Sequence, residues 1–393
     1  MKTMKWKFYS LAFVAGMSIL TACSSDDNND NDGNGGNGNG NEIENGTILK
    51  GTITSDVTLA AGNTYKLSGE YIVEEGATLH IEEGVKIIAV YDDIADYILV
   101  KQGGKINAVG TPDKPIVMTS EKEEPGAWGG IHICGRAHTN AEGGKGSSEI
   151  GGAVYGGNDD ADNSGTLQYI RLEYTGFAFD EEHEANGISF YGVGNGTIVD
   201  HCQAYKGSDD GFEFFGGSVN VSNLVAVSCS DDSFDWTEGW NGKGTNLVAY
   251  QEAESTLGYD CDCLMECDNN GSNNAATPVA HPVLKNLILV SNGGSKQGIR
   301  LRAGTEVEID NAKVCGKGQP LTVETALTEN ALKNGTSKLT NITLTSELSS
   351  KEGIYTHADF IAVTSNKVDA NLSYSSFEDI KKECSWMNGS WVK

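Results

Sequence analysis

A four-residue motif that recurs along the middle of the chain constrains its fold more than any other feature. The stretch SDDGFEFF at 208–215 returns 22 residues later as SDDSFDWT at 230–237, with acid aligned on acid and aromatic on aromatic. Aligning the chain on this pair gives a first frame in five copies: Gly187–Phe190, Gly211–Phe214, Ser233–Trp236, Leu264–Cys267 and Gly298–Leu301. Alternate side chains of a β-strand face opposite ways, so the second residue of each copy should point inward and the third outward. The outward positions are Ser189, Glu213, Asp235, Glu266 and Arg300.

A second frame carries Asn at its third position and small or apolar residues at its fourth and sixth positions. Its copies supply Asn223, Asn246, Asn286, Asn311 and Asn341. Asn tolerates the left-handed backbone of a tight corner, and its amide can hydrogen-bond to the same amide one layer away. We therefore predict a structural Asn ladder, preceded by Tyr169 and His201 at the same place in two earlier copies.

Two short strands per repeat, a repeat of about 22 to 40 residues and the Asn column predict a β-solenoid. A β-sandwich or propeller would not explain five Asn in one register. We take the coil as right-handed, the usual hand of parallel crossovers. The predicted fold class is all-β, a single-stranded right-handed parallel β-helix over residues 47–393. We expect long loops at 136–165 and 250–283, and a C-terminal cap from about 353 in which the stretch SFEDIKKECSWMNGSWV closes the open end.

The N-terminus has the features of an export and lipidation signal. Residues 1–22 carry three Lys and then an apolar run that is short for a membrane span, which is typical of a secretory signal peptide. The signal ends in Leu-Thr-Ala before Cys23, a bacterial lipobox in which Cys23 becomes acylated. The polar Asn, Gly and Asp residues up to 46 then form a flexible tether. These features predict a lipid-anchored outer-membrane protein on the extracellular face; a periplasm-facing lipoprotein is the alternative.

Both frames, together with YGGNDDADNSGTLQYIRLEYTG at 155–176 and the paired acidic motifs, resemble the pectate-lyase-like right-handed parallel β-helix superfamily. Within it, the chain is most similar to bacterial surface lipoproteins of unassigned activity. The resemblance covers most of residues 47–350. It implies the fold and says little about chemistry.

The repeated acids are the main candidate site. Layers of a parallel solenoid repeat at roughly 4.8 Å, so Glu213 and Asp235 should stand about that far apart. Asp209 and Asp210 should lie beneath Asp231 and Asp232. Such a column of like charges is costly unless a cation, a donor or a shared proton relieves it, or unless it is well solvated.

Three functions fit this column. It could hold Ca²⁺ at Asp209, Asp210, Asp231 and Asp232, since Ca²⁺ prefers clustered carboxylates. It could be catalytic, with Glu213, Asp235, Glu266 and Arg300 as the residues of a polysaccharide lyase or glycoside hydrolase. Acids beside an Arg resemble the arrangement in pectate lyases, in which Ca²⁺ carries the substrate uronate and Arg is the base. The third reading, which we favour, is a non-catalytic face that binds a glycan or another surface protein, with Trp240, Tyr250 and Tyr259 as candidate stacking platforms.

The net charge and the cysteine content narrow the possible partners and cysteine roles further. The formal net charge is −27, and removal of three signal-peptide Lys leaves the remainder near −30. Such a surface repels nucleic acid, so no nucleic-acid partner is expected. Eight Cys besides Cys23 in an exported protein favour one or more disulfides over a metal cluster.

Overall fold

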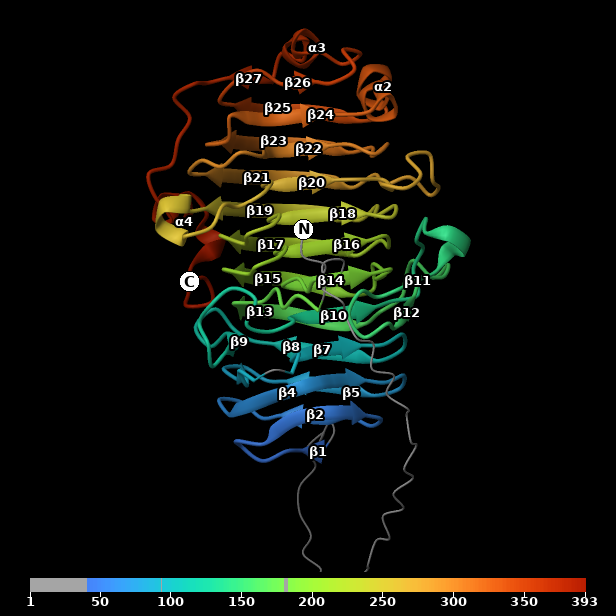
Figure 1. Cartoon of the computed structure of the whole chain (residues 1–393), viewed down its shortest axis with the longest axis vertical. Coiled ribbons are helices and arrows are strands. Elements are labelled where there is room, and N and C mark those ends of the chain that lie inside the picture. The colour runs from blue at the N-terminus through green and yellow to red at the C-terminus, as the bar shows by residue number, and fades with distance from the viewer. Residues whose placement is uncertain (1–40, 93, 180–182) are drawn as a thin grey trace, which may run out of the picture. The chain divides into compact units, whose positions relative to one another are not determined.

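The computed structural model describes residues 41–92, 94–179 and 183–393, which form a right-handed parallel β-helix (Figure 1). In this part of the chain 25 strands join one sheet that winds into stacked coils, and every pairing within it is parallel. The predicted fold class is confirmed. None of the described helices is long and apolar enough to cross a membrane. The signal peptide, Cys23 and most of the tether lie outside the described residues.

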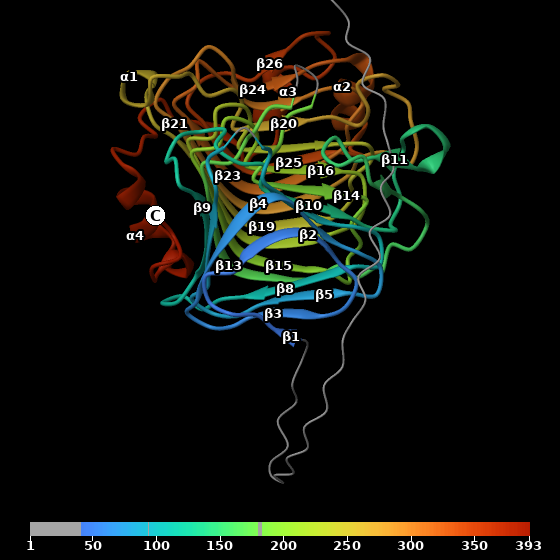
Figure 2. The same cartoon turned by 60° about the horizontal axis from the view of Figure 1, so that its bottom comes forward.

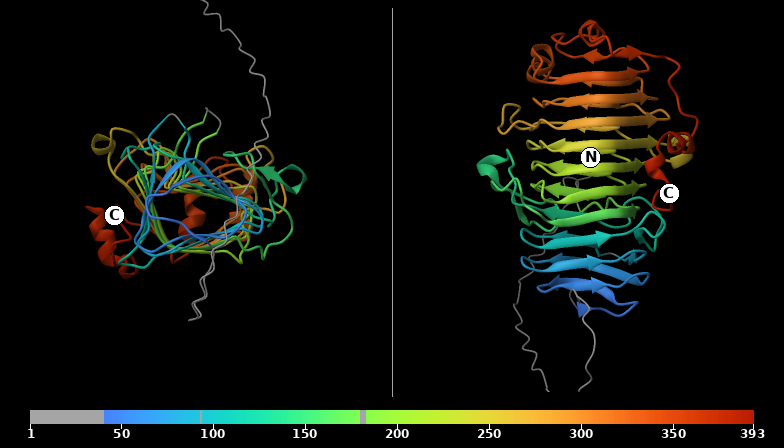
Figure 3. Two further views of the ribbon diagram at one scale, coloured as in Figure 1. Left: turned by 90° about the horizontal axis from the view of Figure 1, so that it is seen from below. Right: turned by 180° about the vertical axis from the view of Figure 1, so that it is seen from behind.

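The first face of the coil carries the first frame, one short strand in each layer. Each of these strands pairs with the equivalent strand of the next layer (Figures 1 and 3). They are β7 (Tyr97–Val100), β10 (Ile131–Cys134), β14 (Ile188–Tyr191), β16 (Phe212–Phe215), β18 (Phe234–Thr237), β20 (Met265–Cys267), β22 (Gln297–Leu301), β24 (Gln319–Val323) and β26 (Ser349–Ser350).

The second frame forms longer strands, most of which bend once and so make the other two faces. The first half of β13 (Gly165–Glu173) pairs with β8 (Lys105–Val109), and its second half pairs with β9 (Ile116–Ser120). The later strands of this type are β15 (Ile198–Tyr205), β17 (Asn220–Val227), β19 (Lys243–Gln251), β21 (Val283–Ser291), β23 (Glu308–Cys315), β25 (Lys338–Leu344) and the short β27 (Lys367–Val368).

The bend falls on the Asn column. All five Asn have a positive φ, between 56° and 64°, which an Asn adopts more readily than most residues. The Nδ2 atom of Asn246 donates to Oδ1 of Asn223 (2.8 Å), Asn286 donates to Asn246 (3.0 Å) and Asn311 donates to Asn286 (2.9 Å). The ladder of side-chain amides therefore runs continuously through four layers.

At each end of this ladder the bond between Asn side chains is replaced by another interaction. Asn341 donates to the carboxylate of Asp310 (2.6 Å). At the other end, Tyr169 and His201 take the same corner with φ values of 51° and 53°, and their rings stack at 4.4 Å. Stacked rings replace stacked amides where the corner lacks Asn.

The coil begins earlier than the sequence indicates. β1 (Asn41–Glu42) lies inside the segment assigned to the tether and already pairs with β3 (Val57–Leu59). The N-terminal layers are built from β2 (Ile48–Ile53), β3 (Val57–Leu59), β4 (Thr64–Val73), β5 (Thr78–Ile81) and β6 (Lys86–Ala89), with β7, β8 and β9 in the layer above them.

Side chains from the inward positions fill the centre of the coil as stacked columns. The ring centroids of Phe190 and Phe214 lie 5.0 Å apart, and those of Phe212 and Phe234 lie 5.6 Å apart. Trp240 stacks on Phe214 at 4.1 Å. The aromatic half of the repeated motif therefore stabilises the core by layer-on-layer packing.

Several segments leave the coil. Between β10 and β13 the chain makes the turn η1 (Glu142–Gly144) and an antiparallel ribbon of β11 (Gly146–Ser147) and β12 (Val154–Tyr155). Between β19 and β21 it includes α1 (Glu254–Leu257) and returns to the coil only at β20. The remaining helical elements are α2 (Ala326–Asn334), α3 (His357–Ala362), α4 (Phe377–Glu383) and η2 (Ser385–Met387).

The predicted cap is correct for one part of the C-terminal region and wrong for the other. Leu348, Tyr355 and Phe360 enter the main core at the end of the coil and close it. The buried carboxylate of Glu329 holds this cap, because it accepts hydrogen bonds from the backbone N–H groups of residues 352, 354 and 355.

Residues 376–392, in contrast, lie against the side wall of the coil (Figure 3). Ile380, Met387 and Trp391 pack in one cluster with apolar residues on the outside of β17, β19 and β21, such as Val248 and Ile288. The physical reason is that these outward positions are apolar and require a cover. The segment therefore covers a hydrophobic wall.

Candidate functional site

The predicted outward column is present, and its register is as expected. The first-sheet pairings place Ser189, Glu213, Asp235, Glu266 and Arg300 directly above one another in successive layers. The 22-residue spacing of the two acidic motifs is thus one turn of the coil.

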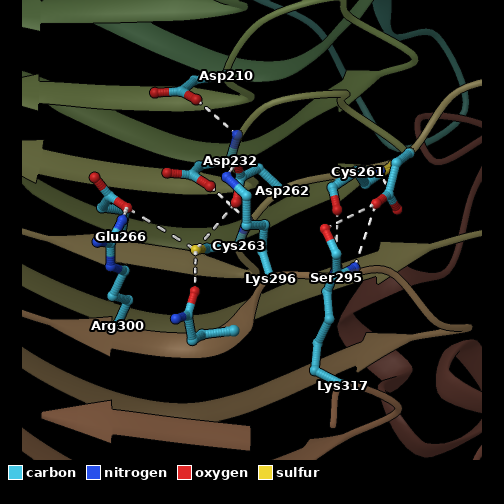
Figure 4. A network of polar contacts seen from close by, with 12 residues as sticks. Asp210, Asp232, Cys261, Asp262, Cys263, Glu266, Ser295, Lys296, Arg300 and Lys317 are labelled. Carbon is cyan, nitrogen blue, oxygen red and sulfur yellow. Dashed lines mark hydrogen bonds and ion pairs between the residues drawn. The ribbon is translucent and has the colours of Figure 1, made fainter. Parts of the chain in front are cut away.

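The second Asp of each motif joins neighbouring layers. The side-chain oxygen of Asn186 accepts the N–H of Asp210 (3.2 Å), Asp210 accepts the N–H of Asp232 (2.8 Å), and Asp232 accepts the N–H of Cys263 (2.6 Å). Figure 4 shows the last two of these bonds. Because Asn186 occupies the first position of this column, the role requires a side-chain oxygen and no charge.

The Ser of the motif acts in the same way. The hydroxyl of Ser208 donates to the carbonyl of Gly176 (2.6 Å), and the hydroxyl of Ser230 donates to the carbonyl of Ser208 (2.6 Å). Two of the three residues in Ser-Asp-Asp are therefore explained by bonds between layers.

Five of the six acids in the two copies of the motif are buried or half-buried, so the alternative of a well-solvated acidic face is wrong. Asp209, Asp210 and Asp232 are only 8%, 5% and 5% exposed, whereas Asp231 is exposed. The Oδ1 atom of Asp235 is buried and has no hydrogen-bond partner among the described residues.

Loops outside the coil account for part of this burial. Ile150, Ala153 and Tyr155 from the β11–β12 region pack with Tyr191 and Phe215, which face outward from β14 and β16. The Oε2 atom of Glu213 in turn accepts a hydrogen bond from Nδ2 of Asn186 (2.6 Å).

Burial raises the pKa of the carboxyl groups here, and the neighbouring carboxylates raise it further. The pKa of Asp209 rises to about 8. The pKa values of Asp210, Glu213, Asp232 and Asp235 also lie well above the usual range, for the same two reasons. This half of the column favours the protonated state or a bound cation.

The other half of the column is neutralised by arginines. Arg300 pairs with Glu266 (2.8 Å) and Glu324 (3.3 Å), and Arg302 pairs with Glu266 (2.9 Å) and Asp268 (2.7 Å). Both oxygens of Glu266 are therefore held by guanidinium groups. Figure 4 shows Glu266 above Arg300.

The predicted disulfides are absent from the described residues, because all eight of their cysteines are free and buried. Cys263 lies in the polar network of Figure 4, where its Sγ atom contacts Asp262 (3.4 Å), Glu266 (3.9 Å) and Gln297 (3.9 Å). Burial raises the pKa of this thiol well above its ordinary value. These cysteines act as small buried side chains.

Of the three aromatic residues considered as stacking platforms, two are buried and one is half-buried. Trp240 is 1% exposed and lies in the core, and Tyr250 packs against Phe377 of α4. Tyr259 is half-buried, and its hydroxyl donates to the carbonyl of Ser228 (2.8 Å).

Two clusters of three carboxylates each could hold a cation. Oxygen atoms of Asp209, Asp210 and Asp231 lie within 4.8 Å of one another, and so do those of Asp210, Glu213 and Asp235. These donors are all hard oxygen atoms, which fit Ca²⁺. Asp232 joins Asp262 and Cys263 in a third group.

A polar pocket of about 680 Å³ opens at the corner that follows β18. Its polar lining includes Asn140, Glu142, Glu238, Asn270, Ser272 and Asn273. Sequence reasoning missed it, because its walls come from three separate segments, at 140–142, 237–238 and 270–273, that no shared motif links. Arg302 and Asn186 were missed too, although each has a sequence signal: Arg302 lies two residues after Arg300, and Asn186 aligns with Asp210 and Asp232.

Comparison with known proteins identifies the family. No curated protein and no solved structure matches the chain. The model of the pectate-lyase-like β-helix domain matches residues 51–393, which is nearly the whole coil together with the C-terminal segment on its wall. The chain therefore belongs to the pectate-lyase-like β-helix domain family.

Proposed function

We propose that the protein is an outer-membrane, surface-exposed lipoprotein that binds a glycan or another surface ligand without chemical turnover. The observation that carries the proposal is the state of the candidate catalytic carboxyls. Glu266 is held on both oxygens by Arg300 and Arg302, and the buried Oδ1 atom of Asp235 is not presented to solvent. General acid–base catalysis requires a carboxyl group within hydrogen-bond reach of the substrate.

A polysaccharide lyase or glycoside hydrolase is the alternative. It would use Glu213, Asp235, Glu266 or Arg300 on the outer face of the first sheet. The Glu213–Asn186 bond and the two ion pairs of Arg300 would have to break before these groups could reach a polymer. Binding requires no such rearrangement.

The lipid anchor rests on the sequence around Cys23. Changing Cys23→Ala should remove the acylation site, so the protein should move from the membrane fraction to the soluble fraction. Changing the adjacent Ser24→Ala is the matched control and should leave the protein in the membrane fraction. A Cys23→Ala variant that stays with membranes would contradict the anchor.

We also propose Ca²⁺ as the cofactor of the half of the acid column whose negative charge Arg300 and Arg302 do not neutralise. The support is the pair of three-carboxylate groups and the Oδ1 atom of Asp235, which lacks a hydrogen-bond partner. A divalent ion there would replace the neutralising role that Arg300 and Arg302 play in the layers above.

Binding is tested by applying residues 41–393, without the signal and tether, to a glycan microarray. We expect saturable binding to a restricted set of glycans, and we expect binding to survive Glu213→Gln and Asp235→Asn. If no glycan binds, the glycan form of the proposal fails. A protein ligand would then be sought by surface cross-linking in intact cells.

A further inference from the structure

The corner after β18 carries a glutamate where the two preceding layers carry glycine. The register of the first sheet aligns Glu238 with Gly216 and Gly192 in the two preceding layers, since each follows directly on a paired strand. All three have a positive φ, of 52°, 65° and 56° respectively. Glycine takes this conformation freely, whereas for a glutamate it costs roughly 1–2 kcal/mol. Glu238 thus keeps its side chain in a left-handed conformation, which Ala303 and Thr325 also adopt at the equivalent corner of later layers.

The carboxylate of Glu238 is fixed from one side. Its Oε2 atom accepts hydrogen bonds from the Thr139 hydroxyl (2.7 Å) and the Tyr155 hydroxyl (2.8 Å). Its backbone carbonyl accepts the N–H of Asn140 (2.9 Å). Both side-chain bonds use the same oxygen, and among the described residues no hydrogen bond to the other oxygen, Oε1, is present, so Oε1 can accept one from a ligand in the pocket that Glu238 lines.

The side chain of Asn140, next to Glu238 in the wall of the pocket, is also fixed by hydrogen bonds. Asn140 is 7% exposed; its Nδ2 atom donates to Oδ1 of Asn269 (2.8 Å), and its Oδ1 atom accepts from Nδ2 of Asn270 (3.0 Å). Ser272 and Asn273 at the rim offer a hydroxyl and an amide. A pocket whose polar groups are fixed before binding loses little entropy when a ligand enters.

The negative charge of the pocket limits the kinds of ligand that it can bind. Glu142 and Glu238 are its two charged lining residues, and no Lys, Arg or His of the described chain lines it. A carboxylate or phosphate on the ligand would meet uncompensated negative charge in a protein whose net charge is already −27. A ligand that donates hydrogen bonds and carries no negative charge fits these groups.

We propose that this pocket binds one unit of a neutral or amine-bearing saccharide, with Oε1 of Glu238 accepting a hydrogen bond from a sugar hydroxyl or ammonium group. The inference rests on the proposed binding function and names the class of glycan. It excludes polyuronates as ligands of this pocket.

The test is isothermal titration calorimetry of residues 41–393 with four probes: maltohexaose, cellohexaose, a chitosan hexamer and hexagalacturonate. The first two probes report a neutral ligand and the third an amine-bearing one. We expect measurable affinity for at least one of these three and at least about tenfold weaker binding of hexagalacturonate. Glu238→Gln should weaken binding about ten- to a hundredfold. The amide oxygen of Gln takes the place of Oε2, so its NH₂ group puts a donor where an acceptor is needed.

Two further variants separate binding from folding. Glu238→Gly should abolish binding and leave the melting temperature close to that of the wild type, because relief of the positive φ offsets the two lost hydrogen bonds. Glu254→Gln in α1, an exposed change outside the pocket, should leave affinity unchanged. If a neutral or amine-bearing probe binds equally well to wild type and Glu238→Gln, the pocket is wrong and the proposed function stands. If none of the four probes binds, the saccharide class and this inference both fall, whereas tight binding of hexagalacturonate alone overturns the inference only.

Discussion

The Asp210→Asn variant should be more stable than the wild-type protein at pH 8 in the presence of a chelator, by about 2–5 °C in melting temperature. Asp210 is 5% exposed, and burial and nearby carboxylates raise its pKa well above the usual range. The Asn side chain keeps the oxygen that accepts the N–H of Asp232, as Asn186 does one layer below. Its NH₂ group would face Glu213 and Asp235, and so would replace a repulsive contact by a donor.

The matched control is Asp113→Asn, the same change at an exposed position, which should leave the melting temperature within about 1 °C. An Asp210→Asn variant that melts below the wild type under these conditions would show that the charged carboxylate stabilises the fold. Adding Ca²⁺ gives a second comparison. If the cofactor proposal holds, a hundredfold excess of Ca²⁺ over its Kd stabilises the wild type by about 2.7 kcal/mol, and Asp210→Asn reduces that gain.

The same carboxyls give the wild-type protein an unusual pH dependence. An unfolded Asp titrates near 3.9, whereas the folded protein holds protons on Asp209 up to a pH of about 8. The folded state therefore binds more protons than the unfolded state over this interval, so stability falls as the pH rises from about 4 to about 8. Asp200 acts in the opposite sense, because its lowered pKa of about 2 removes stability only below about pH 4. The melting temperature should thus be highest near pH 4–5.

Removing Arg302 should have the largest destabilising effect in the column. Arg302→Met keeps most of the aliphatic volume and leaves Asp268 and one oxygen of Glu266 without a cation. These carboxylates are 8% and 15% exposed, while Arg302 itself is 33% exposed, so the loss falls below that of a fully buried pair. We expect the free energy of unfolding at pH 8 to drop by about 2–3 kcal/mol, measured by urea denaturation.

Lys382→Met is the control for Arg302→Met, since Lys382 is 74% exposed and pairs with Asp379 on the surface of α4. That change should leave the urea denaturation curve close to that of the wild type, because an ion pair between solvent-exposed side chains contributes little to stability. Equal losses for the two variants would mean that the arginines do not compensate the acid column.

The fold was predictable because its determinants are periodic. The inward Phe residues and the Asn corners repeat once per layer, so one alignment of the sequence with itself gives both the strand register and the bend. The position of the C-terminal segment was not predictable, because the apolar wall that it covers is read as ordinary strand residues. A sequence shows that Val248 and Ile288 are apolar, but not which of the two faces of the strand lacks a cover.

The candidate site was predictable only in part. The register brings Glu213, Asp235, Glu266 and Arg300 together as the sequence indicates. Their burial depends on loops such as 146–155, whose path over the first sheet follows no repeat. The bonds that use up Asp210 and Asp232 come from the backbone of the next layer, and Glu238 meets Asn140 only because two irregular loops converge at one corner.

Whether the protein binds a saccharide without turnover is tested by the chemical fate of the bound saccharide. The wild-type protein is incubated with the oligosaccharide that it binds most tightly and with polygalacturonate, with and without Ca²⁺. Products are followed as new reducing ends and as the ultraviolet absorbance of unsaturated sugars. We expect that both saccharides are recovered intact. Product formation by the wild type that disappears in Glu213→Gln or Asp235→Asn would contradict it and would identify the acid column as catalytic.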